Sequence, residues 1–86
     1  MYLKISVITI VWNGRQFIEH AITSVLGQSY ANKEYIVIDG GSKDGTLDLI
    51  KSFASGITHW VSEQDDGIAD AFNKGLSLAT GDYIFF

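Results

Sequence analysis

Glu34-Tyr-Ile-Val-Ile-Asp-Gly-Gly-Ser-Lys-Asp-Gly45 is a short apolar run that ends in a glycine-rich turn. Apolar runs of this length that are rich in β-branched residues are typical of a strand covered on both faces. The residues after the turn have helical spacing, and the apolar side chains expected to face inward are Leu47, Ile50, Phe53 and Ala54. A strand, a turn and a helix in this order indicate part of a parallel β-α-β unit.

The same alternation continues on the N-terminal side of this segment. Residues 3–11 (LKISVITIV) form another near-continuous apolar run, which predicts a central parallel strand. Residues 15–26 then place apolar side chains at spacings of three and four, so that a helix is expected there, with Gly27 at its end.

On the C-terminal side, residues 57–62 and 83–86 have the pattern of two more strands. The helix expected between them begins at a cap formed by Asp65 or Asp66, and Gly81 closes it. Its inward face is predicted to carry Ile68, Ala71, Phe72, Leu76 and Ala79. The order β-α-β-α-β-α-β predicts an α/β fold, an open parallel, Rossmann-like sheet with helices on both faces.

Composition limits the classes of partner. The net charge is -4 and no cluster of Lys or Arg stands out, so a nucleic-acid partner is not expected. The chain has no cysteine, no signal-peptide pattern at its start and no apolar run near the ~20 residues of a membrane span, which makes the cytoplasm the expected location. The last residues, Tyr83 to Phe86, are apolar, and we interpret them as a strand cut short whose exposed edge favours a dimer.

Ligands of open parallel sheets bind beyond the carboxyl ends of the strands. Three strand-to-helix corners would lie at that edge, residues 11–14, 39–45 and 62–67, and all three are polar or glycine-rich. The turn matches neither common nucleotide motif, because Ser42 replaces a glycine of the dinucleotide fingerprint and Thr46 stands where the phosphate loop has lysine.

Each candidate in the first two corners has a functional and a structural interpretation. Asp39 ends an apolar strand, where its carboxylate can bind a base or ribose or can serve as a cap or turn residue. Trp12 can stack on a flat ligand or belong to the core, and Asn13 beside it is expected to serve the turn. The turn glycines permit close approach of a ligand, but a tight turn requires glycine for the same reason.

The third corner is acidic. Glu63, Asp65 and Asp66 can bind a cation or ribose hydroxyls, or they can favour the N-terminus of the following helix. Lys74 can neutralise a phosphate or simply be solvated. The two histidines, His20 and His59, have no partner at metal-ligand spacing and are assigned to structure or surface.

Taken together, the corners resemble the family 2 glycosyltransferases, enzymes with the GT-A fold. The resemblance rests on three segments in order along nearly the whole chain. They are Ile5-Ser-Val-Ile-Thr-Ile-Val-Trp-Asn13, Asp39-Gly-Gly-Ser-Lys-Asp-Gly-Thr46, and Ser62-Glu-Gln-Asp-Asp-Gly-Ile-Ala-Asp-Ala-Phe-Asn-Lys-Gly75 followed by Ala79-Thr-Gly-Asp82. Residues 1–86 would then be a partial GT-A domain, its nucleotide-binding half.

The resemblance implies a nucleotide-diphosphate sugar, of the UDP or GDP type, as donor. Ile10 and Trp12 would line the base pocket, and Asp39 would contact the nucleoside. The family's motif has a second aspartate where this chain has Gly40, which leaves Asp39, helped by Asp65, to recognise the nucleoside. The full set of expected donor-binding residues is Ile10, Trp12, Asn13, Asp39, Gly40, Asp65 and Lys74.

The resemblance also implies chemistry that lies outside these residues. Its Asp-x-Asp motif, which binds Mg²⁺ or Mn²⁺, and its general base are expected beyond Phe86, so that these 86 residues alone should transfer no sugar. The implied acceptor is a polysaccharide or a lipid-linked glycan at the inner face of a bacterial membrane. The alternatives are a non-catalytic nucleotide-binding module and a purely structural α/β domain.

Overall fold

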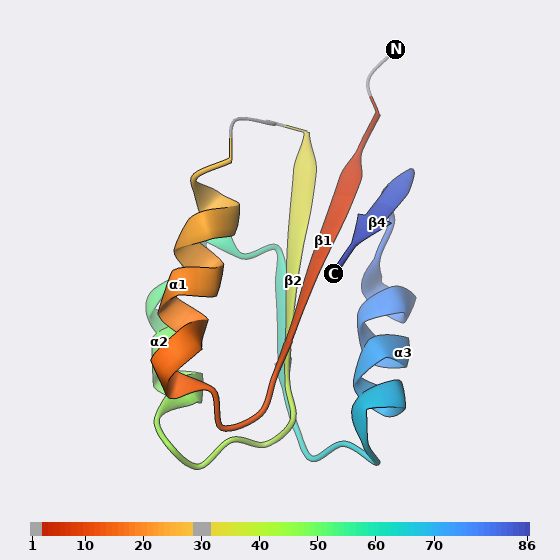
Figure 1. Ribbon diagram of the computed structural model, residues 1–86. Helices are drawn as coiled ribbons and strands as arrows, with labels where there is room; N and C mark the ends of the chain where they lie inside the picture. Colours follow the sequence, from red (N-terminus) through yellow and green to blue (C-terminus); the bar gives the residue numbers. More distant parts are fainter. Residues whose placement is uncertain (1–2, 29–31) are drawn as a thin grey trace.

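The computed structural model describes residues 3–28 and 32–86. Strands and helices alternate along the chain, and the four strands form one parallel sheet in the order β3-β2-β1-β4 (Figure 1). The elements are β1 (Ile5–Val11), α1 (Arg15–Leu26), β2 (Lys33–Asp39), α2 (Thr46–Ser52), a short 3-10 helix η1 (Ala54–Gly56), β3 (His59–Ser62), α3 (Ile68–Leu78) and β4 (Tyr83–Phe85). The predicted fold class and order of elements are confirmed, and β1 is an inner strand.

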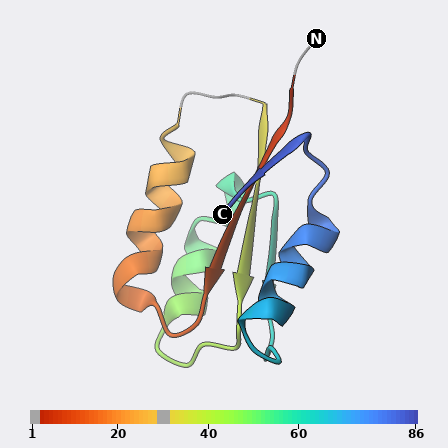
Figure 2. The same cartoon turned by 45° about the vertical axis from the view of Figure 1, so that its right-hand side comes forward.

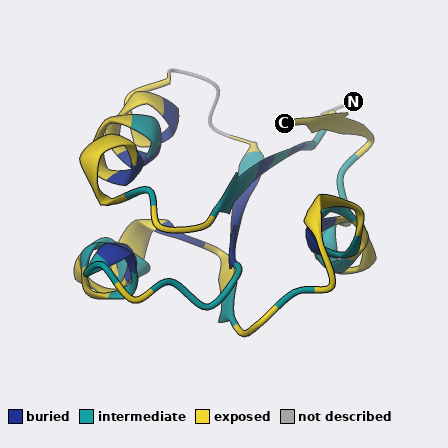
Figure 3. Cartoon of the chain, turned by 60° about the horizontal axis from the view of Figure 1, so that its bottom comes forward, coloured by how far each residue is buried: buried dark blue, intermediate teal, exposed yellow. Residues whose placement is uncertain are grey.

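The helices form two outer layers. Helices α1 and α2 cover one face of the sheet and α3 covers the other, with the buried residues on the sides that face the strands (Figure 3). The core on the α1 and α2 side consists of Ile18, Ile22, Val25, Tyr35, Val37, Ile50 and Ile57. The core on the α3 side is smaller and consists of Ile8, Ile36, Ile38 and Ala71. Strand β2 contributes to both cores and is therefore covered on both faces, which explains its near-continuous apolar run.

Helix α3 packs against the sheet through small residues and not through the large apolar residues predicted for its inward face. Ala71 and Gly75 are buried, and a Cβ at Gly75 would lie 2.7 Å from Cγ2 of Ile8. Ile68 and Leu76, expected to face inward, are exposed, Ile68 to 69%. The prediction failed because the helix lies too close to β1 for large side chains at its contact line.

Several predicted boundaries were wrong. The third strand begins at His59 and not at residue 57. Thr58 donates its N–H to Tyr35 O, but the Tyr35 N–H donates to the Thr58 side-chain hydroxyl and not to a backbone carbonyl, so the regular strand pairing starts one residue later. Helix α3 begins after Gly67 without a side-chain cap, so neither Asp65 nor Asp66 caps it. Gly81 does not close α3, which ends at Leu78.

A buried hydrogen-bond network, which we call the Glu34 clasp, joins the N-terminal ends of β1 and β2 to the segment before β4. The carboxylate of Glu34 accepts hydrogen bonds from the Ser6 hydroxyl and from the backbone N–H of Thr80 at 2.5 Å. The ammonium of Lys4 lies 3.5 Å from Glu34 Oε1 and donates to Thr80 Oγ1 at 2.6 Å. Gly81 passes so close that its own N–H donates to Ser6 Oγ at 2.8 Å. The clasp therefore fixes where β4 joins the sheet.

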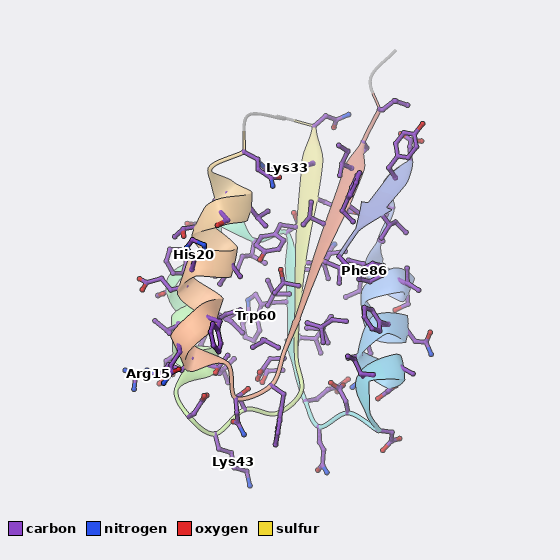
Figure 4. All side chains as sticks on the ribbon, viewed as in Figure 1. Arg15, His20, Lys33, Lys43, Trp60 and Phe86 are labelled. Carbon is purple, nitrogen blue, oxygen red and sulfur yellow. The ribbon has the colours of Figure 1, made fainter. Side chains whose placement is uncertain are left out.

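Strand β4 lies at the sheet edge beside β1, as expected, and its apolar side chains are exposed. Phe86 follows it and packs its ring edge-on against Phe72 of α3, with ring centroids 4.7 Å apart (Figure 4). Within residues 3–28 and 32–86, no helix combines the length and apolar character that crossing a membrane requires.

Candidate functional site

The loops that follow β1, β2 and β3 meet at one edge of the sheet, as Figures 1 and 2 show at the bottom of the molecule. Backbone hydrogen bonds connect neighbouring loops: the Gly40 N–H donates to Val11 O at 2.9 Å, and the Glu63 N–H donates to Asp39 O at 3.0 Å. Lys43 marks this edge in Figure 4, and Lys33 marks the opposite one. The prediction that the three corners share one rim of the sheet is confirmed.

Asp39, at the end of β2, holds the second and third loops together. Its side chain is fully buried, and its Oδ2 accepts hydrogen bonds from the Ser62 hydroxyl at 2.7 Å and the Ser42 N–H at 3.1 Å. Oδ1 accepts a third hydrogen bond from the Ser42 hydroxyl. Asp39 lines neither of the two cavities at this edge, and its contact with a nucleoside stays a prediction. Its position agrees with the alternative interpretation as a turn residue.

A cavity of about 470 Å³ lies at the carboxyl ends of β1 and β2. Its lining combines apolar side chains with a few polar groups, namely Ile10, Val11, Trp12, Gly40, Gln64, Asp65, Gly67, Ile68 and Ala71. The side chain of Trp12 is 69% exposed, so the alternative that it belongs to the core is wrong. An exposed indole beside aliphatic walls offers a stacking surface for a flat ring.

Asn13 shapes the first corner and borders a second, smaller cavity. Its backbone has φ 49°, an uncommon value for a non-glycine residue. Its N–H donates to Ser42 Oγ at 2.7 Å, and its side-chain oxygen accepts from the Lys43 N–H at 2.9 Å, as the turn interpretation predicts. The second cavity, of about 260 Å³, is lined by Trp12, Asn13, Gly40, Gly41, Lys43 and Gln64. The indole of Trp12 therefore borders both cavities.

Asp65 occupies the space that a side chain at position 40 would fill. A Cβ built on Gly40 would lie 2.9 Å from Oδ2 of Asp65 and 3.4 Å from Cδ1 of Trp12. The other carboxylate oxygen of Asp65, Oδ1, pairs with the ammonium of Lys74. Asp65 thus reaches the cavity wall from the third corner while α3 holds it from behind.

Lys74 is neither solvated nor placed on a cavity wall. Its ammonium lies 3.1 Å from Glu63 Oε1 and 3.4 Å from Asp70 Oδ2, in addition to its contact with Asp65. The hydrogen bond with Asp65 is the largest of the causes that raise the pKa of Lys74 above its usual value. The interpretation of Lys74 as a simply solvated lysine is therefore wrong, and a contact of its ammonium with a phosphate stays a prediction.

The same arrangement answers whether these acidic residues hold a metal ion. Glu63, Asp65 and Asp70 converge on the Lys74 ammonium, so a cation of the protein already occupies the centre of the acidic group. Within the described ranges, 3–28 and 32–86, no group of three or more His, Asp or Glu side chains is arranged to bind a metal. In this arrangement the three carboxylates are paired with Lys74.

Several cavity residues were not predicted from the sequence. Gln64 borders both cavities, and Gly67, Ile68 and Ala71 border the larger one. Exposed Ile68 carried a usable signal, since a large apolar residue directly after a polar loop can face a ligand. Ile68, together with Ile10, also lines an adjoining apolar cavity of about 310 Å³ that reaches Phe72 and Phe86.

Comparison with known families identifies the protein class. The sequence model of glycosyl transferase family 2 matches residues 6–86, nearly the whole chain. The chain belongs to this family. Family membership agrees with the resemblance inferred from the three corner segments.

Two curated relatives from bacteria share more than a third of their aligned residues with this family 2 chain. An uncharacterized glycosyltransferase of Mycobacterium tuberculosis is 40% identical over 83 residues, which cover 95% of this chain and 32% of that protein. The putative teichuronic acid biosynthesis glycosyltransferase TuaG of Bacillus subtilis is 39% identical over 85 residues, covering 95% of this chain and 34% of TuaG. The chain thus spans about a third of the length of these relatives.

Solved structures of glycosyltransferases have the same fold. A mannosyltransferase of Pyrobaculum calidifontis, in complex with GDP-Man and Mn²⁺, superposes with a TM-score of 0.87 at 27% identity, over 98% of this chain and 26% of that one. Residues 1–349 of S. aureus TarS superpose with a TM-score of 0.83 at 26% identity, over 98% of this chain and 27% of that one. A TarS structure in complex with UDP-GlcNAc is also similar. The GT-A, Rossmann-like fold expected from the resemblance is confirmed.

Proposed function

We propose that this family 2 chain binds the nucleoside of a nucleotide-diphosphate sugar in the 470 Å³ cavity and serves as the donor-binding part of a glycosyltransferase. The observation that supports this most strongly is the cavity's composition and place. It lies at the carboxyl ends of parallel strands, where α/β sheets bind ligands, and it pairs an exposed indole with a carboxylate. Two glycosyltransferases with the same fold were solved with GDP-Man or UDP-GlcNAc bound.

We propose that the metal ligands and the general base of the reaction are not among these 86 residues. The curated relatives are about three times as long as this chain, and we propose that the additional length supplies the Mg²⁺ or Mn²⁺ ligands and the general base. The 86 residues alone would then bind a donor without transferring its sugar. The acceptor we propose is a polysaccharide or lipid-linked glycan at the cytoplasmic face of the membrane, which the teichuronic acid assignment of TuaG supports. Dimerisation through the exposed β4 edge stays a proposal as well.

Replacing Trp12 with alanine tests the proposed cavity. Loss of a stacking surface costs about 1–3 kcal/mol per base, so we expect UDP and GDP to bind the variant about 10-fold to 100-fold more weakly. Isothermal titration of the chain with each nucleotide measures the effect. Phe17→Ala is the matched control, because Phe17 is a similarly exposed aromatic, at 72%, that lines none of the three cavities. Equal losses in the two variants, or no binding of either nucleotide by the unaltered chain, would contradict the proposal.

A further inference from the structure

We propose that Asp65 selects the base of the nucleotide, and that Lys74 is a positioning residue that holds the Asp65 carboxylate in the space left open by Gly40. This inference rests on the proposed function of the cavity and adds to it the class of base that the cavity accepts. It also gives Lys74 a role through Asp65 in place of a contact with phosphate.

The two oxygens of Asp65 have different surroundings. Its side chain is only 11% exposed, yet it lines the 470 Å³ cavity. Oδ1 pairs with Lys74, whereas Oδ2 accepts no hydrogen bond from the described residues and lies beside Gly40 and Trp12. One acceptor oxygen therefore borders the cavity next to the stacking surface of the indole.

Lys74 determines the orientation of this carboxylate. Its ammonium also contacts Glu63 and Asp70, and it lines neither of the two cavities at the loop edge. Without Lys74, three carboxylates would stand near one another with no cation between them, and their repulsion would turn Asp65 away from its present place.

An ionised carboxylate only accepts hydrogen bonds, so the base must present a donor to Oδ2 of Asp65. Uracil offers the ring N3–H and guanine the ring N1–H at their pairing edges. Cytosine and adenine have an unprotonated ring nitrogen at the same places, whose lone pair would face the carboxylate. They could pair with Oδ2 only by shifting in the cavity until the neighbouring exocyclic amino group reached it. The cavity is therefore expected to favour uridine and guanosine nucleotides over cytidine and adenosine nucleotides. UDP and CDP form the best matched pair, because they differ only at this edge of the pyrimidine.

Gly40 and Asp65 should behave as a coupled pair of positions. Gly40 does not have the positive φ that Gly41 and Gly45 have, so its backbone tolerates a side chain. The atom nearest to a Cβ at this position is Oδ2 of Asp65, at 2.9 Å, and the next nearest belong to Trp12. Adding Asp at position 40 should thus impair the site when Asp65 is present. It should restore an acceptor to the cavity when Asp65 is shortened to alanine.

The test measures the ratio of UDP to CDP affinity by isothermal titration for the unaltered chain, Asp65→Ala, Gly40→Asp and the double variant. We expect a preference for UDP of about 10-fold or more in the unaltered chain, from one hydrogen bond to a charged group. The preference should disappear in D65A and G40D and return in G40D/D65A. Circular dichroism spectra establish that each variant is folded, and D65N provides a second loss of charge with the side-chain volume retained.

Lys74 requires a separate pair of variants. We expect K74M to lose the UDP preference and K74R to keep it, whereas E63Q keeps it because Glu63 contacts Lys74 from outside the cavity. The proposal is overturned if folded D65A and D65N bind UDP with the original preference over CDP, or if K74M does. An unaltered chain that binds neither UDP nor GDP refutes the proposed function itself, whereas UDP binding without preference refutes only the inference about Asp65.

Discussion

Replacing Glu34 with alanine is expected to lower the free energy of unfolding by about 3–4 kcal/mol, because the variant loses a buried carboxylate that accepts several hydrogen bonds. The substitution leaves the buried Ser6 hydroxyl and the Thr80 N–H without their acceptor, and it leaves the Lys4 ammonium without a counter-charge. Domains of this size have total stabilities of about 5–15 kcal/mol, so the loss is a large part of the whole. Chemical denaturation followed by circular dichroism measures it.

The Glu34 clasp also predicts how stability depends on pH. Burial raises the pKa of Glu34, but hydrogen bonds from Ser6 and Thr80, with the Lys4 charge, outweigh it and lower the pKa to about 2 from 4.5. The stabilising contribution is therefore complete above pH 4.5 and decreases as the pH falls toward 2. This difference in pKa corresponds to about 3 kcal/mol. Glu34→Gln should show a flatter pH dependence over this interval, and exposed Glu19→Gln should behave as the unaltered chain. A steep loss that persists in E34Q would contradict the assignment.

Replacing Asp39 is expected to have the second largest effect. The main loss is in the free energy of unfolding. Asp39→Ala removes two hydrogen bonds from Ser42 within the second corner and one from Ser62 that joins this corner to the third, at a cost of about 3 kcal/mol. Nucleotide affinity should fall together with stability, because Gly40 and Gln64 on the cavity wall follow these loops.

Asp39→Asn separates this role from direct contact with a nucleoside. The amide keeps the volume and one acceptor, and the Ser42 hydroxyl can turn to accept from its NH₂, so part of the lost stability should be recovered. Affinity for UDP and GDP should recover in proportion if Asp39 acts through the loops. A variant that is as stable as the unaltered chain but no longer binds nucleotide would show that Asp39 contacts the ligand itself. Exposed Asp66→Asn is the control, with no change expected in either quantity.

The fold was predictable because its signals are local. The apolar runs of β1 and β2, the stripe of α1 and the glycine-rich turn each lie within a few neighbouring residues, and their alternation allows few topologies. The rim of the sheet that carries the candidate site followed from the parallel order of the strands. Family membership rested on the three corner segments and was therefore accessible as well.

The side-chain details were not predictable, because they depend on contacts between residues far apart in the sequence. The sequence pattern does not show that Ser6 and Thr80 meet at Glu34, or that α3 approaches β1 closely enough to require Gly75. The same holds for Lys74, whose helical position gives no sign that its ammonium lies among three carboxylates. Asp39 was recognised as a candidate, but only the three-dimensional arrangement shows that serines already satisfy its oxygens.

The central claim is that a nucleotide binds between the first and third corners, and an NMR titration of the isotope-labelled chain with UDP and with GDP tests it most directly. We expect the amide resonances of Gly40, Gln64, Gly67 and Ile68, which line the 470 Å³ cavity, to shift in a saturable manner. The amides of His20 on the outer face of α1 and of Thr80 at the opposite edge should stay unchanged. Shifts confined to that opposite edge, or no shift at the cavity with either nucleotide, would contradict the claim.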